Sequence, residues 1–278
     1  MKFSSNKKIM IPFALIIILF LFAMVFPFIW IFITSFKSSG EIFGTGAFNI
    51  IPESPTLSNY VNVLFEKNIL KAVFNSFIVA TTTTVYVILV ATFCSYAISR
   101  FDFKGKSVLL GLVLAVSMFP QMIITGPVYN LFYQFDWLNS YFVVLPYSTI
   151  TLPMAVWILV THFNQIPLAL EESATIDGAT RIQTLVKIVF PLAAPGVFTT
   201  AIITFIAAWN EFLLTITLNS NSSYHTVPVA ISFLRTQFSI LWGEVAAATA
   251  VVTVPTLIIV LVFQKQIVSG LTSGGVKE

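Results

Sequence analysis

The stretch IMIPFALIIILFLFAMVFPFIWIFIT, from Ile9 to Thr34, decides the fold of this chain. It contains no charged residue, and it exceeds the roughly 20 apolar residues that a helix needs to cross a bilayer. Lysines precede it, as in a secretory signal, but the block is too long for one and no small-residue cleavage site follows. We therefore expect an uncleaved first membrane-spanning helix.

Further apolar blocks of similar length follow along the chain. Of the 278 residues, 57% are hydrophobic and 9% are charged, whereas a soluble domain carries about 25% charged residues. The sequence predicts an all-α fold, a polytopic membrane bundle of about six transmembrane helices that forms a single domain over residues 1–278. The later blocks lie at about Ala72–Ile98, Val108–Phe132, Tyr141–Thr161, Leu192–Leu218 and Trp242–Phe263.

Lysine and arginine are unequally distributed between the alternate connections. With the N-terminus inside, the internal segments hold ten of the 14 basic residues. Cytoplasmic loops of membrane proteins carry such an excess. We therefore expect both termini in the cytoplasm, including a C-terminal tail from about residue 264 to 278.

Proline lies within or at the edge of several predicted spans. It kinks a helix, and the freed carbonyl groups then need protein or water as partners. Either these kinks serve a bundle that changes shape, or proline is simply common in membrane helices; the pattern leaves both open. The positions are Pro120, Pro127, Pro146, Pro153 and Pro255.

The composition argues against several classes of function. The net charge of +3 comes without a basic run, so nothing indicates nucleic-acid binding. Cys94, the single cysteine, lies in an apolar block, and we expect a small buried side chain rather than a metal ligand. No Gly-x-x-x-x-Gly-Lys-Ser/Thr phosphate loop occurs. We expect no catalytic residue, no metal and no cofactor on this chain.

The connection from Phe163 to Pro191 is too polar to span the bilayer and has the pattern of two short helices. Pro167 is suited to start the first, and Asp177-Gly178 to end it in a turn. Thr180 and Gln183 have the spacing of a capping box for the second. Its expected apolar stripe consists of Ile182, Leu185, Val186 and Val189. The pattern predicts either a preformed knob that docks to another protein or a helix pair that rests on lipid.

The same connection resembles the EAA motif of the permeases of ATP-binding-cassette (ABC) importers. That motif is Glu-Ala-Ala, three residues, Gly, nine residues, and Ile-x-Leu-Pro. This chain has Glu172-Ser173-Ala174, then Gly178, then Ile188-Val189-Phe190-Pro191 at the same spacing. Ser173 and Phe190 depart from the motif. We call residues 163–191 the EAA loop.

The resemblance extends over nearly the whole chain, to the second permease subunit of carbohydrate importers of the maltose and trehalose type. Matching segments include Ser99–Lys106, Leu152-Pro153-Met154, Trp209–Phe212 and the tail Gly270–Lys277. The resemblance implies a non-catalytic transport subunit in the cytoplasmic membrane of a prokaryote, which moves a di- or oligosaccharide by alternating access. It also implies partners: a second homologous permease subunit, two ATP-binding subunits that hold ATP and Mg, and an extracytoplasmic sugar-binding protein.

In that family the EAA loop inserts into a cleft of the ATP-binding subunit. The resemblance therefore implies a coupling role for one set of residues in this chain. The set consists of Glu171, Glu172, Ser173, Ala174, Asp177, Gly178, Ala179, Ile188 and Pro191.

Trp209, Asn210 and Glu211 form a polar group inside the fifth predicted span. A charged carboxylate near the bilayer centre costs about 2.5 kcal/mol or more, so it is expected to face the bundle interior or water. Aromatic rings stack on sugars and carboxylates accept bonds from hydroxyl groups, which favours a place on the substrate path. Glu211 near the outer interface, paired with the partner subunit, remains the alternative.

Two other classes of function agree less well with the sequence. An intramembrane transferase would need paired acidic or His groups at one depth, and apart from Glu211 the spans show no second clearly buried acid. A membrane sensor or scaffold would not account for the EAA spacing.

The charge count yields a test of topology. A reporter enzyme that is active only outside the cell, fused to residue 278, is expected to be inactive, because the basic residues hold the C-terminus inside. The connection from about Asn219 to Leu241 follows the fifth predicted span and is expected outside, so a reporter placed there is the matched control and is expected to be active. Strong activity at residue 278 contradicts the orientation.

Overall fold

The computed structural model describes residues 7–235 and 240–273. Within these ranges the regular structure is helical, with one isolated β-bridge between Arg235 and Ile240, which confirms the all-α prediction. The chain divides into two compact units, Met1–Ile69 with Ile231–Pro255, and Leu70–Ala230 with Thr256–Glu278. We call them unit 1 and unit 2 and describe each by itself.

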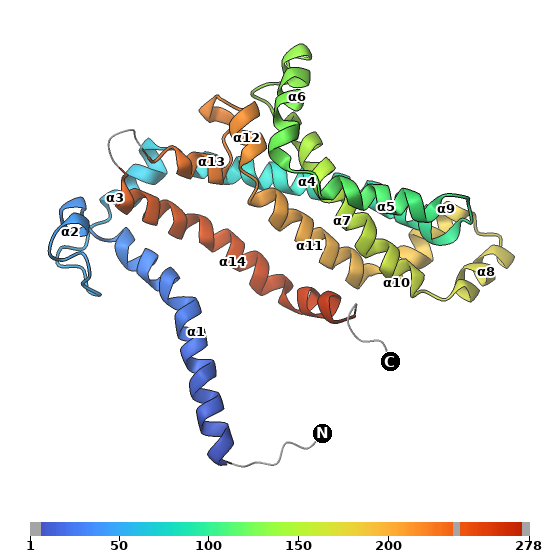
Figure 1. The fold of residues 1–278 in the computed structure, drawn as a ribbon, viewed down its shortest axis with the longest axis horizontal. Helices are drawn as coiled ribbons and strands as arrows, with labels where there is room; N and C mark the ends of the chain where they lie inside the picture. Colours follow the sequence, from blue (N-terminus) through green and yellow to red (C-terminus); the bar gives the residue numbers. More distant parts are fainter. Residues whose placement is uncertain (1–6, 236–239, 274–278) are drawn as a thin grey trace. The chain divides into compact units, whose positions relative to one another are not determined.

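Unit 1 contains the first long helix and the start of the last one (Figure 1). The connection after α1 carries three short helical segments. The elements are α1 (Lys7–Ser35), α2 (Ser39–Phe43), α3 (Ser58–Val61), the π-helix η1 (Asn62–Glu66) and the first part of α14 (Trp242–Ser273).

The side chain of Asn59 ties the end of α1 to α3. Its amide Nδ2 donates to the carbonyl oxygens of Ser35 and Lys37, each at 2.9 Å. Gly243 of α14 lies so close that a Cβ there would come within 2.7 Å of the same amide. A buried amide that satisfies two carbonyl groups replaces bonds that the end of α1 lacks.

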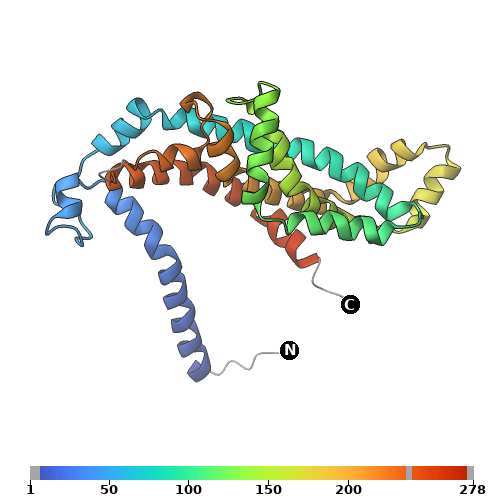
Figure 2. The ribbon, with the colours of Figure 1, turned by 45° about the horizontal axis from the view of Figure 1, so that its top comes forward.

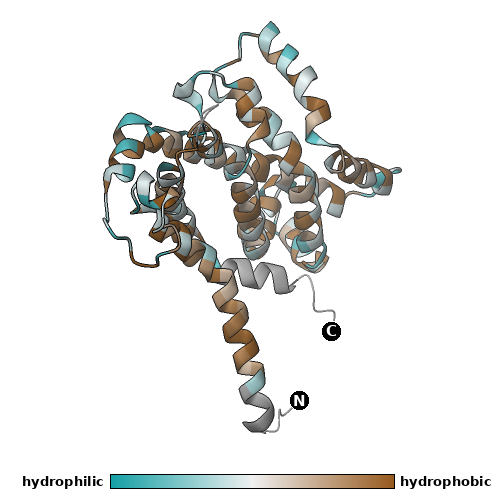
Figure 3. Cartoon of the chain, turned by 60° about the vertical axis from the view of Figure 1, so that its left-hand side comes forward, coloured by the Kyte–Doolittle hydropathy of each residue, from teal (hydrophilic) through white to brown (hydrophobic). Residues whose placement is uncertain are grey.

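Helix α1 is apolar along nearly its whole length, as its brown colour in Figure 3 shows. None of the 18-residue window that identifies it as a span is buried within the chain. An apolar helix with no buried face needs lipid or another protein around it.

Unit 2 holds the remaining helices. In order they are α4 (Ile69–Arg100), α5 (Lys106–Ser117), α6 (Gln121–Gln134), η2 (Tyr141–Val143), α7 (Val144–Asn164), α8 (Leu168–Ile176), α9 (Arg181–Thr184), the π-helix η3 (Leu185–Val189), α10 (Phe190–Leu192), α11 (Ala194–Trp209), α12 (Leu213–Leu218), η4 (Ser222–Tyr224) and α13 (Val227–Ser232). Figures 1 and 2 show α8 and α9 together at one end of the long helices α4 and α7.

Four helices are long and apolar enough to cross a membrane, and two bent pairs bring the number to six if each pair is one span. The single ones are Pro12–Ser35, Ile69–Arg100, Tyr141–Asn164 and Trp242–Gln264. The third predicted span bends by 89° between α5 and α6, and a bend of 80° separates Arg181–Leu192 from α11. The predicted fifth span ends early, because α11 stops at Trp209 and α12 is a separate helix.

Proline explains both bends. Pro120 precedes the first residue of α6, and Pro195 is the second residue of α11. A proline ring excludes the carbonyl group four residues earlier, so a helix arriving from the N-terminal side stops before it. Pro153 and Pro255 instead lie inside continuous helices. Helix α14 continues to Ser273, through most of the predicted tail, and residues 274–278 lie outside the described residues.

The core of unit 2 joins α4, α7, the EAA loop and α11. Its buried side chains include Val87, Leu159, Phe163, Val189 and Val197. Cys94 does not belong to it: the prediction of a buried cysteine is wrong, since its side chain is exposed on α4. A residue within an apolar stretch of sequence need not be buried in the protein, because an apolar side chain can also face lipid.

The other end of α4 is held by a buried amide. Asn75 Nδ2 donates to the carbonyl oxygens of Ser223 and His225, each at 2.9 Å, and its Oδ1 accepts from the Tyr141 hydroxyl at 2.7 Å. Burial lowers the pKa of His225, so this imidazole is neutral at pH 7. One side chain thus joins three segments that are far apart in the sequence.

A close approach between α7 and α11 in unit 2 gives a stability test. A Cβ at Gly196 of α11 would lie 2.4 Å from the ring of His162 on α7. We expect Gly196→Ala to destabilise the purified protein by about 1–3 kcal/mol, as overpacking does, and thermal unfolding in detergent measures it.

Gly111→Ala on α5 is the matched control, because its Cβ would meet nothing within 4 Å. Adding His162→Ala to Gly196→Ala is expected to recover part of the loss, since the ring that clashes is gone. Equal unfolding temperatures for the two single alanine variants would contradict the close contact.

Candidate functional site

The first helix of the EAA loop, α8, has a buried face and an exposed face. Glu171 and Ala174 are buried against unit 2, while Glu172 and Ser173 are exposed. Pro167, predicted to be the first residue of this helix, occupies the N-cap position, and α8 begins one residue later at Leu168. The neighbouring residues Glu171 and Glu172 therefore lie on different faces of α8, because successive helical residues are about 100° apart.

The turn between the two helices is a Schellman motif. Ala179 N–H donates to Ala174 O at 2.9 Å, and Gly178 N–H donates to Thr175 O at 3.1 Å. Gly178 has φ +82°, in the left-handed region that favours glycine. The sequence prediction of a glycine turn after Asp177 is confirmed.

The second helix begins with the predicted capping box. Gln183 N–H donates to Thr180 Oγ1 at 3.3 Å, and Thr180 N–H donates to Gln183 Oε1 at 2.8 Å. The helix then passes through the π-helical turn η3 to Leu192. Ile188 is partly buried in η3, and Pro191 is exposed in α10.

The predicted apolar stripe of this helix is half wrong. Leu185 and Val189 are buried, but Ile182 and Val186 are exposed, at 67% and 54%. The wider π turn changes the phase of the helix, so the 3.6-residue period used for the prediction does not hold there. Two apolar side chains therefore lie on the outer surface of the loop.

An exposed apolar tip results, with charged groups beside it. Ile176 is 86% exposed at the end of α8, and Ile182 follows across the turn. Glu172, Asp177 and Gly178 are exposed as well, and Ala179 is partly so. Exposed apolar side chains on a rigid, capped support are typical of a protein contact surface.

The base of the loop is held by a buried ion pair between Arg100 and Glu171. Arg100 Nε contacts Glu171 Oε1, and the Tyr96 hydroxyl donates to Glu171 Oε2 at 3.0 Å. Arg100 Nη2 also donates to the carbonyl oxygens of Phe163 at 2.9 Å and Ile166 at 3.2 Å. Sequence analysis missed this pairing because 71 residues separate the two charges.

Trp209, Asn210 and Glu211 lie at a break between α11 and α12. The Trp209 ring is buried and stacks on Phe205, and Asn210 is exposed. The Glu211 carboxylate accepts from the backbone N–H of Leu214 at 2.8 Å and of Thr215 at 3.4 Å. The side chain caps the start of α12, an interaction that apolar patterning alone does not reveal.

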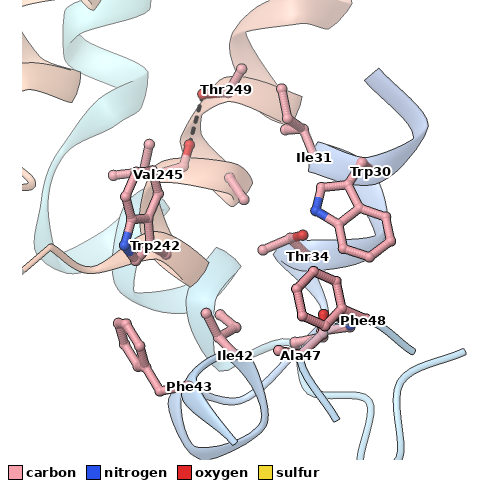
Figure 4. Close-up of a pocket in the computed structure, with 12 residues that line it drawn as sticks. Trp30, Ile31, Thr34, Ile42, Phe43, Ala47, Phe48, Trp242, Val245 and Thr249 are labelled. Carbon is pink, nitrogen blue, oxygen red and sulfur yellow. Dashed lines mark hydrogen bonds between the residues drawn. The ribbon is translucent and has the colours of Figure 1, made fainter. Parts of the chain in front are cut away.

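Unit 1 contains a cavity of about 480 Å³ that sequence reasoning did not find. In Figure 4 the rings of Trp30 and Phe48 lie on one side of it and those of Phe43 and Trp242 on the other. Lys37, 1% exposed, also lines it and donates to the carbonyl oxygens of Gly46 and Ala47. Among the described residues of the whole chain, no group of three or more His, Cys, Asp or Glu could hold a metal ion.

Comparison with known proteins assigns the chain to a family. The profile described as "Binding-protein-dependent transport system inner membrane component" matches residues 88–273. The chain is 40% identical, over 91% of its length, to the sulfoquinovosyl glycerol transport system permease protein SmoH of Agrobacterium fabrum, and covers 88% of that protein. It is also 40% identical, over 91% of both chains, to the trehalose/maltose transport system permease protein MalG of Thermococcus litoralis.

The fold has a counterpart among solved structures. A bacterial ABC transporter involved in the import of the acidic polysaccharide alginate superimposes with a TM-score of 0.80 at 22% identity, over 95% of this chain and 99% of that one. The profile match covers most of the chain and includes the EAA loop, and two relatives share 40% of their residues with it. The chain therefore belongs to the family of inner membrane components of binding-protein-dependent transport systems.

Proposed function

We propose that this chain is one of two membrane-spanning subunits of an ATP-driven importer for a di- or oligosaccharide. The observation that carries the proposal is the EAA loop, a capped helix pair with an anchored base and an exposed apolar tip at Ile176 and Ile182. Relatives that bear the names of a trehalose/maltose and a sulfoquinovosyl glycerol permease support a carbohydrate substrate.

The energy source in this proposal is a pair of separate ATP-binding subunits that hold ATP and Mg. The tip of the EAA loop docks into a cleft of one of them, and the second permease subunit docks to the other. An extracytoplasmic sugar-binding protein delivers the substrate. A solved transporter of similar fold has been described in complex with a periplasmic protein that carries an alginate pentasaccharide, which supports this last partner.

A crosslinking experiment tests the assignment directly. Ile176→Cys in a Cys94→Ser background places a thiol at the exposed tip, whereas Ala174, inside the motif, is buried. Bifunctional crosslinking in membranes of the native host is expected to join this chain to a nucleotide-binding protein, identified by mass spectrometry. If the thiol labels readily but no such protein is joined, the importer assignment fails.

Sugar specificity and path require a separate measurement. Uptake of radiolabelled trehalose, maltose and longer oligosaccharides by the reconstituted complex identifies the substrate class. On the proposed path, Asn210 and Glu211 offer polar groups at the break after α11, and the buried ring of Trp209 supports them from behind.

Gly178→Val is expected to abolish coupling while leaving the chain in the membrane. A side chain in the left-handed region costs about 1–2 kcal/mol, and a β-branched one more, so the turn changes and the angle between α8 and α9 is lost. Gly178→Asn is the matched control, because asparagine tolerates this conformation. Quantitative copurification of the ATP-binding subunit is expected to fall for Val and to persist for Asn. Normal binding and uptake by the Val variant would falsify the role of the turn.

Glu211→Gln separates the capping role of Glu211 from its proposed role on the sugar path. The amide oxygen of glutamine still accepts one N–H of α12, so subunit assembly is expected to stay normal while sugar uptake falls. Glu211→Ala also removes the cap, which costs about 0.5–2 kcal/mol, and is expected to lower thermal stability as well. Normal uptake by Glu211→Gln together with failed assembly of Glu211→Ala would show a purely structural residue.

A further inference from the structure

Arg100, the last residue of α4, contacts the ends of two other helices in unit 2. Its guanidinium donates to the Phe163 and Ile166 carbonyl oxygens at the end of α7, and it pairs with Glu171 in the first turn of α8. The side chains of Arg100 and Glu171 are only 4% and 11% exposed. One side chain thus joins two membrane spans to the EAA loop.

The charges match the dipoles of the three helices. The C-terminal ends of α4 and α7 carry partial negative charge, and the cationic guanidinium lies against both. The first turn of α8 carries partial positive charge, and Glu171 lies there. A planar guanidinium can satisfy several acceptors in fixed directions, which a lysine ammonium cannot do.

The ion pair is completed by Tyr96, whose hydroxyl binds the second carboxylate oxygen of Glu171. Removing one partner of a buried pair leaves an uncompensated charge, so separating Arg100 from Glu171 is energetically unfavourable. The second helix of the loop is attached nearby, because the Arg181 guanidinium lies 5.2 Å from the Phe101 ring centroid. Phe101 directly follows Arg100.

We propose that Arg100 is a positioning residue that makes the EAA loop and the ends of α4 and α7 move as one rigid body. This inference rests on the proposed function, in which ATP-driven movement reaches the loop first. Glu172, on the exposed face, serves contact with the partner, while Glu171 transmits the movement to the spans. The two adjacent glutamates thus have different roles, because Glu172 takes part in docking and Glu171 transmits the movement to the spans.

Distance measurements by electron spin resonance test the rigid body. Spin labels at Leu168 on α8 and Leu89 on α4, both exposed and both away from the docking tip, are introduced into the Cys94→Ser complex reconstituted in nanodiscs. In the otherwise native complex we expect one distance, unchanged between the nucleotide-free state and the state trapped with ATP and vanadate. A change of that distance between the two states overturns the proposal.

The same measurement is repeated with Glu171→Gln and Arg100→Lys, and Glu172→Gln is the matched control. The first two variants are expected to broaden the distribution of distances between the two labels or to add a second distance. Glu172→Gln is expected to leave the distribution unchanged, although it weakens binding of the ATP-binding subunit. A single, unchanged distance in both Glu171→Gln and Arg100→Lys contradicts the proposal.

A measurement of transport shows whether the Arg100–Glu171 pair positions the EAA loop or only stabilises the folded protein. At equal amounts of assembled complex, Glu171→Gln is expected to keep ATP hydrolysis while sugar uptake per ATP falls about tenfold, within the usual range of coupling energies. The exchanged pair Arg100→Glu/Glu171→Arg restores opposite charges but cannot donate to the α7 carbonyl groups, so we expect partial recovery. Unchanged uptake per ATP in Glu171→Gln sinks the inference, whereas a complex without any ATP-binding subunit sinks the proposed function.

Discussion

The bilayer cannot supply hydrogen bonds to a backbone, and the structure depends on that constraint. The described spans are helices, and the chain interrupts them where proline removes a donor or where side chains supply new partners. Asn59 and Asn75 satisfy carbonyl groups where helices end, and Glu211 satisfies N–H groups where α12 begins. These three polar side chains therefore satisfy backbone groups where helices start or stop.

Local backbone hydrogen bonds likewise define the EAA loop. Its two helices have a Schellman turn and a capping box, so they keep their shape without a partner. The base is buried in the core of unit 2 through Leu185 and Val189, and the tip at Ile176 remains exposed. A rigid element with one anchored and one exposed end is suited to carry force from a neighbouring protein into the bundle.

The break after α11 combines a structural and a chemical role at one place. Trp209 is packed against Phe205, while Glu211 is engaged with the backbone of α12. A carboxylate that already caps a helix is fixed in position, which reduces the entropy lost when a sugar hydroxyl binds it. Preorganisation of this kind connects the helix break with the proposed substrate path.

The sequence by itself determined the all-α membrane fold, the extent of the EAA loop, its glycine turn at Gly178 and its capping box at Thr180. These features are local: apolar length, turn chemistry and fixed spacing act within a few residues. Only the tertiary structure decided that Ile182 and Val186 are exposed, that Cys94 is on the surface, and that Glu171 pairs with Arg100. Those outcomes depend on a π turn and on contacts between residues far apart in the chain, and where lipid replaces water, hydrophobicity no longer distinguishes a buried side chain from an exposed one.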